Sequence, residues 1–344
     1  MGPQHTPCAA DATGRTACRA FHWHSLPQGL GCRGAPGGSP VKTREIPIGS
    51  FKVGGGHPLF LIAGPCVIES EEACFACAKL VKQAAAEAQM PLIFKSSFDK
   101  ANRSSISSYR GPGLKAGLQV LKAIKQELQL PLLTDIHCVS QAEAAAEVVD
   151  ILQVPALLCR QTDLLVAAGE TGRPVNVKKG QFMAPGDMHN IVAKIKSTDN
   201  EDILLTERGT CFGYHYLIND MRSLPSMRQL GYPVIYDATH SVQLPSGLGN
   251  RSSGERYYVP ALARAAVAAG IDGLFMEVHP DPDRALSDGP NMLRVKDLPP
   301  LLAMLKKVDE AVREYVAAET FDAKPHRAGE HNTLLQVWSK DRDD

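Results

Sequence analysis

Ionisable side chains stand at the ends of short apolar runs throughout the middle of the chain. Such groups are costly to bury unless partners or ligands satisfy them. An ordinary polar cap explains any one of these residues, but eight polar ends in succession indicate a site for chemistry. The ends carry Cys66, Lys95, Asp135 with His137, Gln153, Lys178 with Lys179, Arg208, His240, and Glu277 with His279.

The cationic residues near these ends predict an anion-binding pocket. Lys95, Lys178, Arg103, Arg160 and Arg208 would gather positive charge in a chain with 37 Lys+Arg, 37 Asp+Glu and a formal net charge of zero. Arginine binds phosphate and carboxylate groups through paired hydrogen bonds, so the pocket suits a polyanionic small molecule. The balanced net charge provides no field that would recruit nucleic acid or an anionic membrane.

Cys66, His240, Glu277 and Asp288 have the side chains of metal ligands. One thiol, one imidazole and two carboxylates suit a divalent ion such as Fe(II), Zn(II), Mn(II) or Co(II), and suit Mg(II) less well. The four residues are widely separated in the sequence, and three of them end apolar runs. From the residues alone, a metal site and a set of ordinary polar caps both stay open.

The apolar runs alternate with longer amphipathic segments, for example one in which Leu114, Leu118, Leu121 and Leu128 share a helical face. Eight strands that are each followed by a helix predict a parallel sheet, and eight strands can close into a (β/α)8 TIM barrel. An open, doubly wound sheet is the alternative. In a barrel all eight polar ends would open on one face, where active sites lie. The runs are LFLIAGP, PLIFKSS, PLLTDIH, ILQVPA, PVNVKK, ILLTER, PVIYDATH and GLFMEVHP.

Side chains alternate in direction along a strand, which limits the residues that can meet in the barrel interior. Asp135 and His137 are two positions apart and should point the same way, whereas only one of Lys178 and Lys179 can face inward. Before the first of these strands, EIPIGSFKVGGGHPL alternates around a glycine. This segment predicts a short N-terminal β-hairpin that closes the bottom of the barrel.

The two ends of the chain differ from its middle. Residues 1–45 are rich in Gly and Pro and poor in acidic residues, which predicts a disordered, low-complexity extension. A transit peptide, an upstream start and an added tail all stay open for this segment. The barrel domain is predicted over 46–318, and 319–344 is predicted as a polar C-terminal tail.

Cysteine usage indicates a reducing, cytoplasmic compartment, because nine cysteines are scattered without a regular framework. Cys74 and Cys77 form a C-x-x-C in an alanine-rich run, where helix packing is favoured over a redox or zinc pair. No run approaches the roughly 20 apolar residues of a membrane span.

Longer motifs resemble a known family of enzymes. IAGPCVIES at 62–70 is similar to the first-strand motif of enzymes that condense phosphoenolpyruvate with an aldose. KSSFDKANRSSISSYRGPGL at 95–114 resembles the 3-deoxy-D-manno-octulosonate 8-phosphate synthase family, whereas heptulosonate synthases carry a K-P-R-T type sequence there. The resemblance covers about residues 46–318. Further matches are TDIH, QVPALLCRQTDL, NVKKGQF, ERGTCFGY, DATHSVQLPSG and FMEVHPDPDRALSDGPN.

Metal dependence divides this family. Its metal-independent members carry Asn at the position of Cys66, so the resemblance implies the metal-dependent branch, with Cys66, His240, Glu277 and Asp288 as ligands of a divalent ion. The segment NRSSGE at 250–255 departs from the Ser-Gly-Gly that many members carry, which puts the detail of one loop near the metal in doubt.

The resemblance implies that phosphoenolpyruvate, D-arabinose 5-phosphate and water give 3-deoxy-D-manno-octulosonate 8-phosphate and phosphate, for lipopolysaccharide biosynthesis, in a homotetramer. Lys95, Lys178 and Arg208, with the Ala156 N–H, would hold phosphoenolpyruvate, and Arg160 would hold the distal sugar phosphate across a subunit interface. His137 beside Asp135 would relay a proton; its alternative is a hydrogen-bonded strand-end histidine. The remaining implied substrate-binding residues are Lys100, Asn102, Arg103, Ser104 and Gln153.

Three rival functions stay open from the sequence. The first is another phosphoenolpyruvate–aldose synthase, which would make a heptulosonate phosphate or a sialic-acid-type product. The second is a Schiff-base aldolase that uses Lys95 or Lys178, because a buried lysine with a lowered pKa is nucleophilic. The third is a barrel without catalytic activity that binds an anion or a metal.

Overall fold

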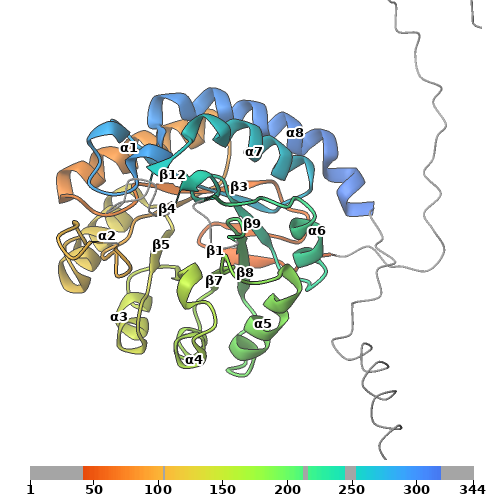
Figure 1. Ribbon diagram of the computed structural model, residues 1–344, viewed down its shortest axis with the longest axis horizontal. Helices are drawn as coiled ribbons and strands as arrows, with labels where there is room; N and C mark the ends of the chain where they lie inside the picture. The colour runs from red at the N-terminus through yellow and green to blue at the C-terminus, as the bar shows by residue number, and fades with distance from the viewer. Residues whose placement is uncertain (1–41, 104, 212–215, 245–252, 319–344) are drawn as a thin grey trace, which may run out of the picture. The chain divides into compact units, whose positions relative to one another are not determined.

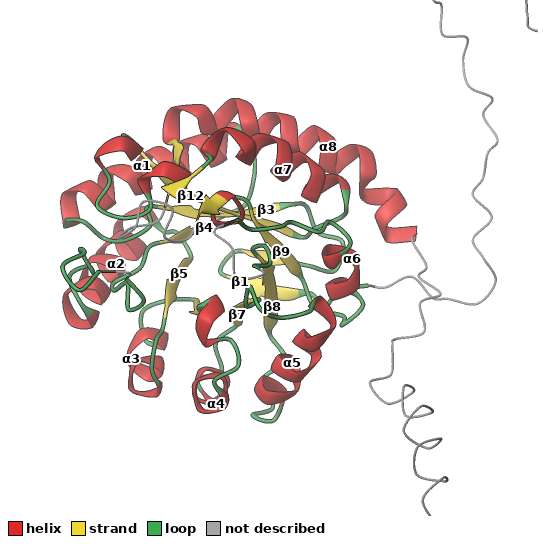
Figure 2. Ribbon diagram, viewed as in Figure 1, coloured by secondary structure: helices red, strands yellow, loops and turns green. Residues whose placement is uncertain are grey.

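Buried strands and amphipathic helices alternate along the chain in the computed structural model (Figures 1 and 2). The structure describes residues 42–103, 105–211, 216–244 and 253–318. All of them belong to one compact unit, Gly37–Asp344. The predicted extension, apart from residues 42–45, and the predicted C-terminal tail lie outside the described residues and stay predictions.

Eight parallel strands form a closed barrel, as predicted. Each strand pairs with the next one along the chain, and the last strand pairs with both the first and the seventh, which closes the ring. A two-residue strand, β13 (Leu293–Arg294), is added beside the last one, and β10 (Gln243–Leu244) pairs with β11 (Ser253–Gly254). The barrel strands are β3 (Phe60–Gly64), β4 (Leu92–Lys95), β5 (Leu132–Asp135), β6 (Ile151–Val154), β7 (Val175–Lys178), β8 (Ile203–Glu207), β9 (Val234–Asp237) and β12 (Gly273–His279).

Helices surround the strands on the outside of the barrel (Figure 2). Leu118, Leu121 and Leu128 of the second helix are buried, which confirms the predicted apolar face. Cys74 and Cys77 lie on the buried face of the first helix, as helix packing predicts. The helices are α1 (Glu71–Glu87), α2 (Leu114–Leu128), α3 (Ala142–Ala146), α4 (Thr162–Glu170), α5 (Met188–Lys196), α6 (Ser223–Arg228), α7 (Val259–Ala268) and α8 (Leu298–Ala318). None of the helices in the described ranges is long and apolar enough to cross a membrane.

The predicted N-terminal hairpin is present and fills the bottom of the barrel. Its strands, β1 (Ile46–Ile48) and β2 (Phe51–Val53), pair antiparallel, and Ile46, Ile48 and Val53 are buried. Just before the hairpin, Thr43 Oγ1 donates to Asp272 Oδ1, at the start of the last strand. The hairpin side chains pack against the apolar interior of the barrel, which consists of Phe60, Ile62, Ile93, Leu133, Ile151, Leu204, Ile235 and Phe275.

The alternation of side chains then dictates what lies above this apolar interior. A position two residues beyond an inward-facing apolar side chain on the same strand must also face inward. Ile93 is followed in this way by Lys95, and Phe275 by Glu277. By the same rule, four further side chains face inward, and all of them are buried. They are Asp135 on β5, Gln153 on β6, Thr206 on β8 and Asp237 on β9.

Candidate active site at the carboxyl ends of the strands

A buried network of charges joins three strands at the mouth of the barrel. Lys95 Nζ lies 2.8 Å from Glu277 Oε1 and 3.9 Å from Asp135 Oδ2, and also donates to the Cys66 carbonyl at 3.1 Å. Asp135 accepts further hydrogen bonds from Ser97 Oγ and Gln153 Nε2. Burial alone would raise the pKa of Asp135. The positive charges of Lys95 and Lys100 have a larger, opposite effect and hold that pKa low.

Asp237 is the centre of a second network, on the other side of the mouth. Its Oδ2 lies 2.6 Å from Lys178 Nζ and 2.7 Å from His240 Nδ1. Lys178 faces the interior, and its Nζ lies 3.6 Å from the centre of the Phe275 ring. Lys179 faces the other way and donates to the carbonyls of the loop that follows its strand. The prediction that only one of the two lysines faces inward is therefore confirmed.

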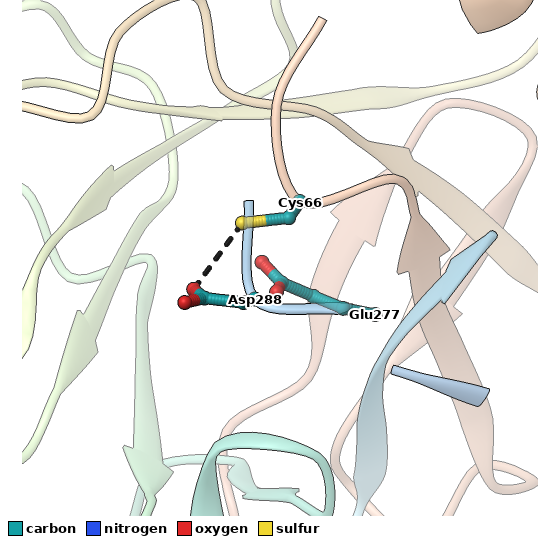
Figure 3. Close-up of side chains that lie close together, drawn as sticks. All are labelled: Cys66, Glu277 and Asp288. Atoms are coloured by element: carbon teal, nitrogen blue, oxygen red, sulfur yellow. Dashed lines mark hydrogen bonds between the residues drawn. The ribbon is translucent and has the colours of Figure 1, made fainter. Parts of the chain in front are cut away.

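Cys66, Glu277 and Asp288 converge as a possible metal-binding cluster (Figure 3). One donor atom from each lies within 4.8 Å of the other two, and Cys66 Sγ is 3.3 Å from Asp288 Oδ2. His240 Nε2 completes the set, 3.4 Å from Glu277 Oε2 and 4.0 Å from Asp288 Oδ2. The structure thus brings all four predicted ligands together, from strand ends and from the loop after β12.

The environment of these donors fits a divalent cation. Glu277 Oε2 is buried and accepts no hydrogen bond within the described part of the chain, although His240 Nε2 is close to it. Burial raises the pKa of the Cys66 thiol well above its usual value, and the charge of Glu277 raises it further. A cation between the four donors would give Glu277 Oε2 a partner and would stabilise the Cys66 thiolate, which is the form of cysteine that binds metals.

A cavity of about 470 Å³ opens beside this cluster. Arg103, Ser287 and Asp288 line one side of it, and Arg103 Nη1 donates to Ser287 Oγ at 2.7 Å. Lys100 lies nearby, with its Nζ 3.7 Å from Glu277 Oε1. Burial alone would lower the pKa of Lys100, but Cys66 and Glu277 raise it, so its ammonium group stays charged. The cavity is lined by Arg103 and Arg256 together with Asp283 and Asp288, and its size suits a small molecule.

The other predicted substrate-binding residues differ in burial, and one of them lies outside the described residues. Arg208 is buried and donates from Nη2 to Gln243 Oε1 at 3.0 Å, while its Nη1 is buried without a hydrogen-bond partner within the described segments. Ala156 begins a 3-10 turn, Ala156–Leu158, directly after β6. Asn102 and Arg160 are exposed, and Ser104 lies outside the described residues. Arg208 thus follows the carboxyl end of β8, as predicted, whereas Arg160 is exposed in the segment between β6 and α4.

His137 lies beyond the end of its strand. Strand β5 ends at Asp135, so the alternation rule no longer fixes the direction of the His137 side chain. Its ring packs edge-on against Phe98, with ring centroids 5.9 Å apart, and its Nδ1 is buried without a hydrogen-bond partner among the residues that the structure describes. Burial lowers the pKa of His137, although Asp135 and Asp99 oppose this effect.

Several residues of the site are not among the sequence predictions. Asp237 joins Lys178 to His240, and Ser287 contacts both Cys66 Sγ and Arg103. Asp237 could have been found from strand alternation, since it is two positions after buried Ile235. Ser287 carries no such signal, because it lies in an irregular loop whose path the sequence pattern does not specify.

Comparisons with known proteins identify the family to which this chain is similar. The model of the DAHP synthetase I family matches residues 39–314. The 2-dehydro-3-deoxyphosphooctonate aldolase of Citrifermentans bemidjiense is 59% identical over 272 residues, which cover 79% of this chain and 100% of that protein. The proteins of the same name from Geotalea daltonii and Geobacter sulfurreducens are 58% and 59% identical over 271 residues, with the same coverage.

The name of these relatives is a synonym of 3-deoxy-D-manno-octulosonate 8-phosphate synthase, so the family resemblance predicted from the motifs is confirmed. The matched segments include every strand of the barrel and the possible metal-binding residues Cys66, Glu277 and Asp288. From its sequence, its barrel and the relatives that it matches over their full length, the chain belongs to the DAHP synthetase I family.

Proposed function

We propose that this enzyme condenses phosphoenolpyruvate with D-arabinose 5-phosphate and water, giving 3-deoxy-D-manno-octulosonate 8-phosphate and inorganic phosphate. The observation that carries the proposal is the mouth of the barrel, where buried lysines and an arginine lie beside a cluster of metal-ligand side chains. Two anionic substrates require such a cationic pocket. The names of the relatives support the same reaction.

Lys95, Lys178 and Arg208 would hold the carboxylate and phosphate of phosphoenolpyruvate, together with the Ala156 N–H. The three side chains are buried and project from three different strands or strand ends of the mouth. Arg208 has one guanidinium nitrogen without a hydrogen-bond partner in the described part of the chain, which leaves it available to an anionic oxygen. Gln153 is hydrogen-bonded to Asp135 and Asn176, and would form the bottom of the pocket that binds this substrate.

Lys100, Asn102, Arg103 and Ser104 would position arabinose 5-phosphate over the cavity. Arg103 borders that cavity and Lys100 borders the cluster of ligands, which supports a place for the aldehyde between them. Arg160 would bind the distal phosphate of a substrate held by a neighbouring subunit. Its exposed position, in the segment between β6 and α4, supports this arrangement.

The reaction forms a bond between C3 of phosphoenolpyruvate and the aldehyde carbon of the sugar, whose oxygen gains a proton. The oxygen of water bonds to C2, and the C2–O bond of the resulting hemiketal phosphate then breaks and releases inorganic phosphate. Holding both substrates in register makes the step effectively unimolecular, which contributes up to about 7–11 kcal/mol when alignment is near ideal.

Cys66, His240, Glu277 and Asp288 would hold a divalent ion, with Fe, Zn, Mn and Co as candidates. Such an ion, when bound, polarises a carbonyl oxygen or lowers the pKa of a water molecule. The orphaned Glu277 oxygen and the mixed S, N and O donor set support its presence. Lys95 would compensate the charge of Glu277 from the opposite side, through the other carboxylate oxygen.

His137 would accept or deliver a proton at the mouth, with Asp135 stabilising its charged form. Because burial lowers the pKa of His137, the imidazole is neutral near pH 7, and its Nδ1, which has no hydrogen-bond partner among the described residues, can accept a proton.

We also propose that the enzyme acts in the cytoplasm, as a homotetramer that serves lipopolysaccharide biosynthesis.

A substrate comparison tests the proposal. Purified protein is given phosphoenolpyruvate with arabinose 5-phosphate, erythrose 4-phosphate or N-acetylmannosamine, and phosphate release is measured together with the mass of the product. We expect turnover with arabinose 5-phosphate. Turnover with only one of the other two sugars would instead identify a heptulosonate or sialic-acid-type synthase, and binding without product would indicate a barrel that only binds its ligand.

Metal removal tests the proposed cofactor. Dipicolinate followed by gel filtration should abolish phosphate release, and Mn(II), Co(II) or Fe(II) should restore it. Full activity in protein shown by elemental analysis to be free of metal would contradict the metal proposal, while leaving the assignment of the substrates intact.

A Schiff-base aldolase is the rival that one observation favours, since burial lowers the pKa of Lys178. In the structure, however, Asp237 holds that ammonium group at 2.6 Å and opposes this lowering of the Lys178 pKa. Borohydride added during turnover should therefore leave the mass of the protein unchanged. A substrate adduct on Lys95 or Lys178 would support the aldolase instead.

A further inference from the structure

Asp237 is the most completely paired carboxylate at the mouth of the barrel, and its two oxygens contact different partners. It is fully buried at the end of β9. Its Oδ1 accepts hydrogen bonds from the backbone N–H groups of Thr239 and His240, at 3.2 and 2.9 Å, and from Thr239 Oγ1 at 3.2 Å. Its Oδ2 contacts Lys178 Nζ and His240 Nδ1.

The two oxygens therefore have separable roles. Oδ1 shapes the turn that leads from β9 into the 3-10 segment His240–Val242, which is a local structural role. Oδ2 makes no backbone hydrogen bond within the described part of the chain and lies between two functional side chains. Only the second oxygen reaches toward the proposed metal ligand and the proposed phosphoenolpyruvate-binding lysine.

The chemistry of the donors fixes the state of the His240 ring. An ionised carboxylate only accepts hydrogen bonds, so the 2.7 Å contact places a proton on His240 Nδ1. In the neutral ring, which is the form that binds a metal, the lone pair is then on Nε2, the nitrogen that faces Glu277 and Asp288. A ligating histidine is commonly oriented in this way by a carboxylate on its other nitrogen, and loss of that carboxylate typically weakens metal binding 10- to 100-fold.

We infer that Asp237 is a positioning residue that couples the metal site to the anion site, by holding His240 and Lys178 with a single carboxylate oxygen. This inference rests on the proposed function, which supplies the roles of His240 and Lys178. Within the described residues, the Asp237 carboxylate contacts the side chains of Lys178, Thr239 and His240 and two backbone N–H groups. In this inference it acts through Lys178 and His240, and not by touching substrate or metal. Its effect must therefore appear as altered metal affinity and altered turnover, and not as lost attraction for an anion.

The variant Asp237→Asn separates the two roles. The carboxamide keeps one carbonyl oxygen, which can serve the turn, and replaces Oδ2 with an NH₂ group, which can only donate. The new NH₂ group would then face two other hydrogen-bond donors, Lys178 Nζ and His240 Nδ1, and could accept from neither of them. Removal of the negative charge also leaves the mouth more cationic, so the attraction for phosphoenolpyruvate is retained.

The test measures Co(II) binding to metal-free protein, followed by the absorption bands of the bound ion, and then steady-state kinetics at saturating Co(II). For Asp237→Asn we expect a Co(II) dissociation constant about 10- to 100-fold higher than that of the unaltered protein. At saturating metal, kcat should fall about tenfold or more, while KM for phosphoenolpyruvate stays equal or decreases. A dissociation constant within threefold of the original, or an unchanged kcat, would overturn the inference.

Asp272→Asn is the matched control, because it makes the same chemical change in another buried aspartate. Asp272 lies at the bottom of the barrel, where it pairs with Thr43 and Arg228. Co(II) affinity and KM should be unchanged in this variant. An equal loss of Co(II) affinity in Asp272→Asn would mean that the effect reflects general destabilisation, and would overturn the assignment to Asp237.

A measurement on the unaltered sequence keeps the test valid if Asp237→Asn does not fold. In Zn(II)-loaded protein with ¹⁵N-labelled histidine, the His240 signals are identified by their absence from His240→Gln. We expect the metal on Nε2 and a retained proton on Nδ1; coordination through Nδ1 would overturn the inference. Unaltered protein that shows this tautomer but makes no product from arabinose 5-phosphate would refute the proposed function and leave the His240 geometry standing.

Discussion

Asp135 illustrates how the mouth of the barrel balances buried charges. Its side chain is almost fully buried, yet it lies 3.9 Å from Lys95 Nζ and accepts hydrogen bonds from Ser97 and Gln153. Burying a carboxylate is unfavourable, and only charges and donors of this kind keep it ionised. Each residue at the mouth therefore contributes to the fold as well as to the site.

This balance predicts a dependence of stability on pH. The pKa of Asp135 is lower in the folded protein than its ordinary value, so the ionised form stabilises the fold above about pH 4. That contribution is lost as the pH falls through the folded pKa, below the ordinary value. In urea unfolding, the difference in unfolding free energy between the unaltered protein and Asp135→Asn should shrink from pH 6 toward pH 3. A difference that grows over this range would contradict the prediction.

At the scale of elements, strand periodicity explains why much of the site could be predicted from the sequence. Lys95, Gln153 and Glu277 follow apolar residues on strands, so their inward direction follows from spacing alone. Asp288 has φ 49° in the loop after β12, and no periodic pattern fixes such a position. It could be predicted only through family resemblance.

Alternation gives the direction of a side chain and not its partners, which explains what sequence reasoning missed. The inward direction of Asp237 follows from Ile235, two positions before it, but its contacts with Lys178 and His240 depend on the pairing of β9 with its neighbours. Period-two reasoning also ends where a strand ends, which is why it does not determine the orientation of His137.

The N-terminal hairpin should matter for stability and little for chemistry. Ile48 is buried at the bottom of the barrel, so Ile48→Ala should lower the free energy of unfolding by about 2–4 kcal/mol through the cavity that it leaves. KM for both substrates should stay the same, because the site is at the opposite end of the strands. Lys52→Ala, at an exposed position of the same hairpin, should cost less than about 1 kcal/mol. A similar loss in both variants, measured by urea unfolding, would contradict this.

The cysteines of α1 should be unreactive in the folded protein. Burial raises the pKa of Cys74 to about 12, and the pKa of Cys77 is raised for the same reason. Iodoacetamide at pH 8, followed by peptide mass spectrometry, should label exposed Cys138 and leave Cys74 and Cys77 unmodified until urea is added. Rapid labelling of the C-x-x-C pair in the native protein would instead favour a redox role.

At the scale of the whole molecule, the proposed homotetramer gives exposed Arg160 a function that one barrel alone does not. Light scattering after gel filtration should give four times the mass of the chain. Arg160→Ala should raise KM for arabinose 5-phosphate about tenfold, the loss expected for one charged hydrogen bond, and should leave KM for phosphoenolpyruvate unchanged. A monomer with full activity would contradict both expectations.

Phe275 affects how the barrel holds two buried lysines that already pair with carboxylates. The ammonium groups of Lys95 and Lys178 lie 5.5 and 3.6 Å from the centre of its ring. The face of an aromatic ring is negative through its quadrupole, yet the ring has no net charge and no proton to exchange. It therefore helps to orient both cations without adding to the negative charge that Asp135, Glu277 and Asp237 already place beside them.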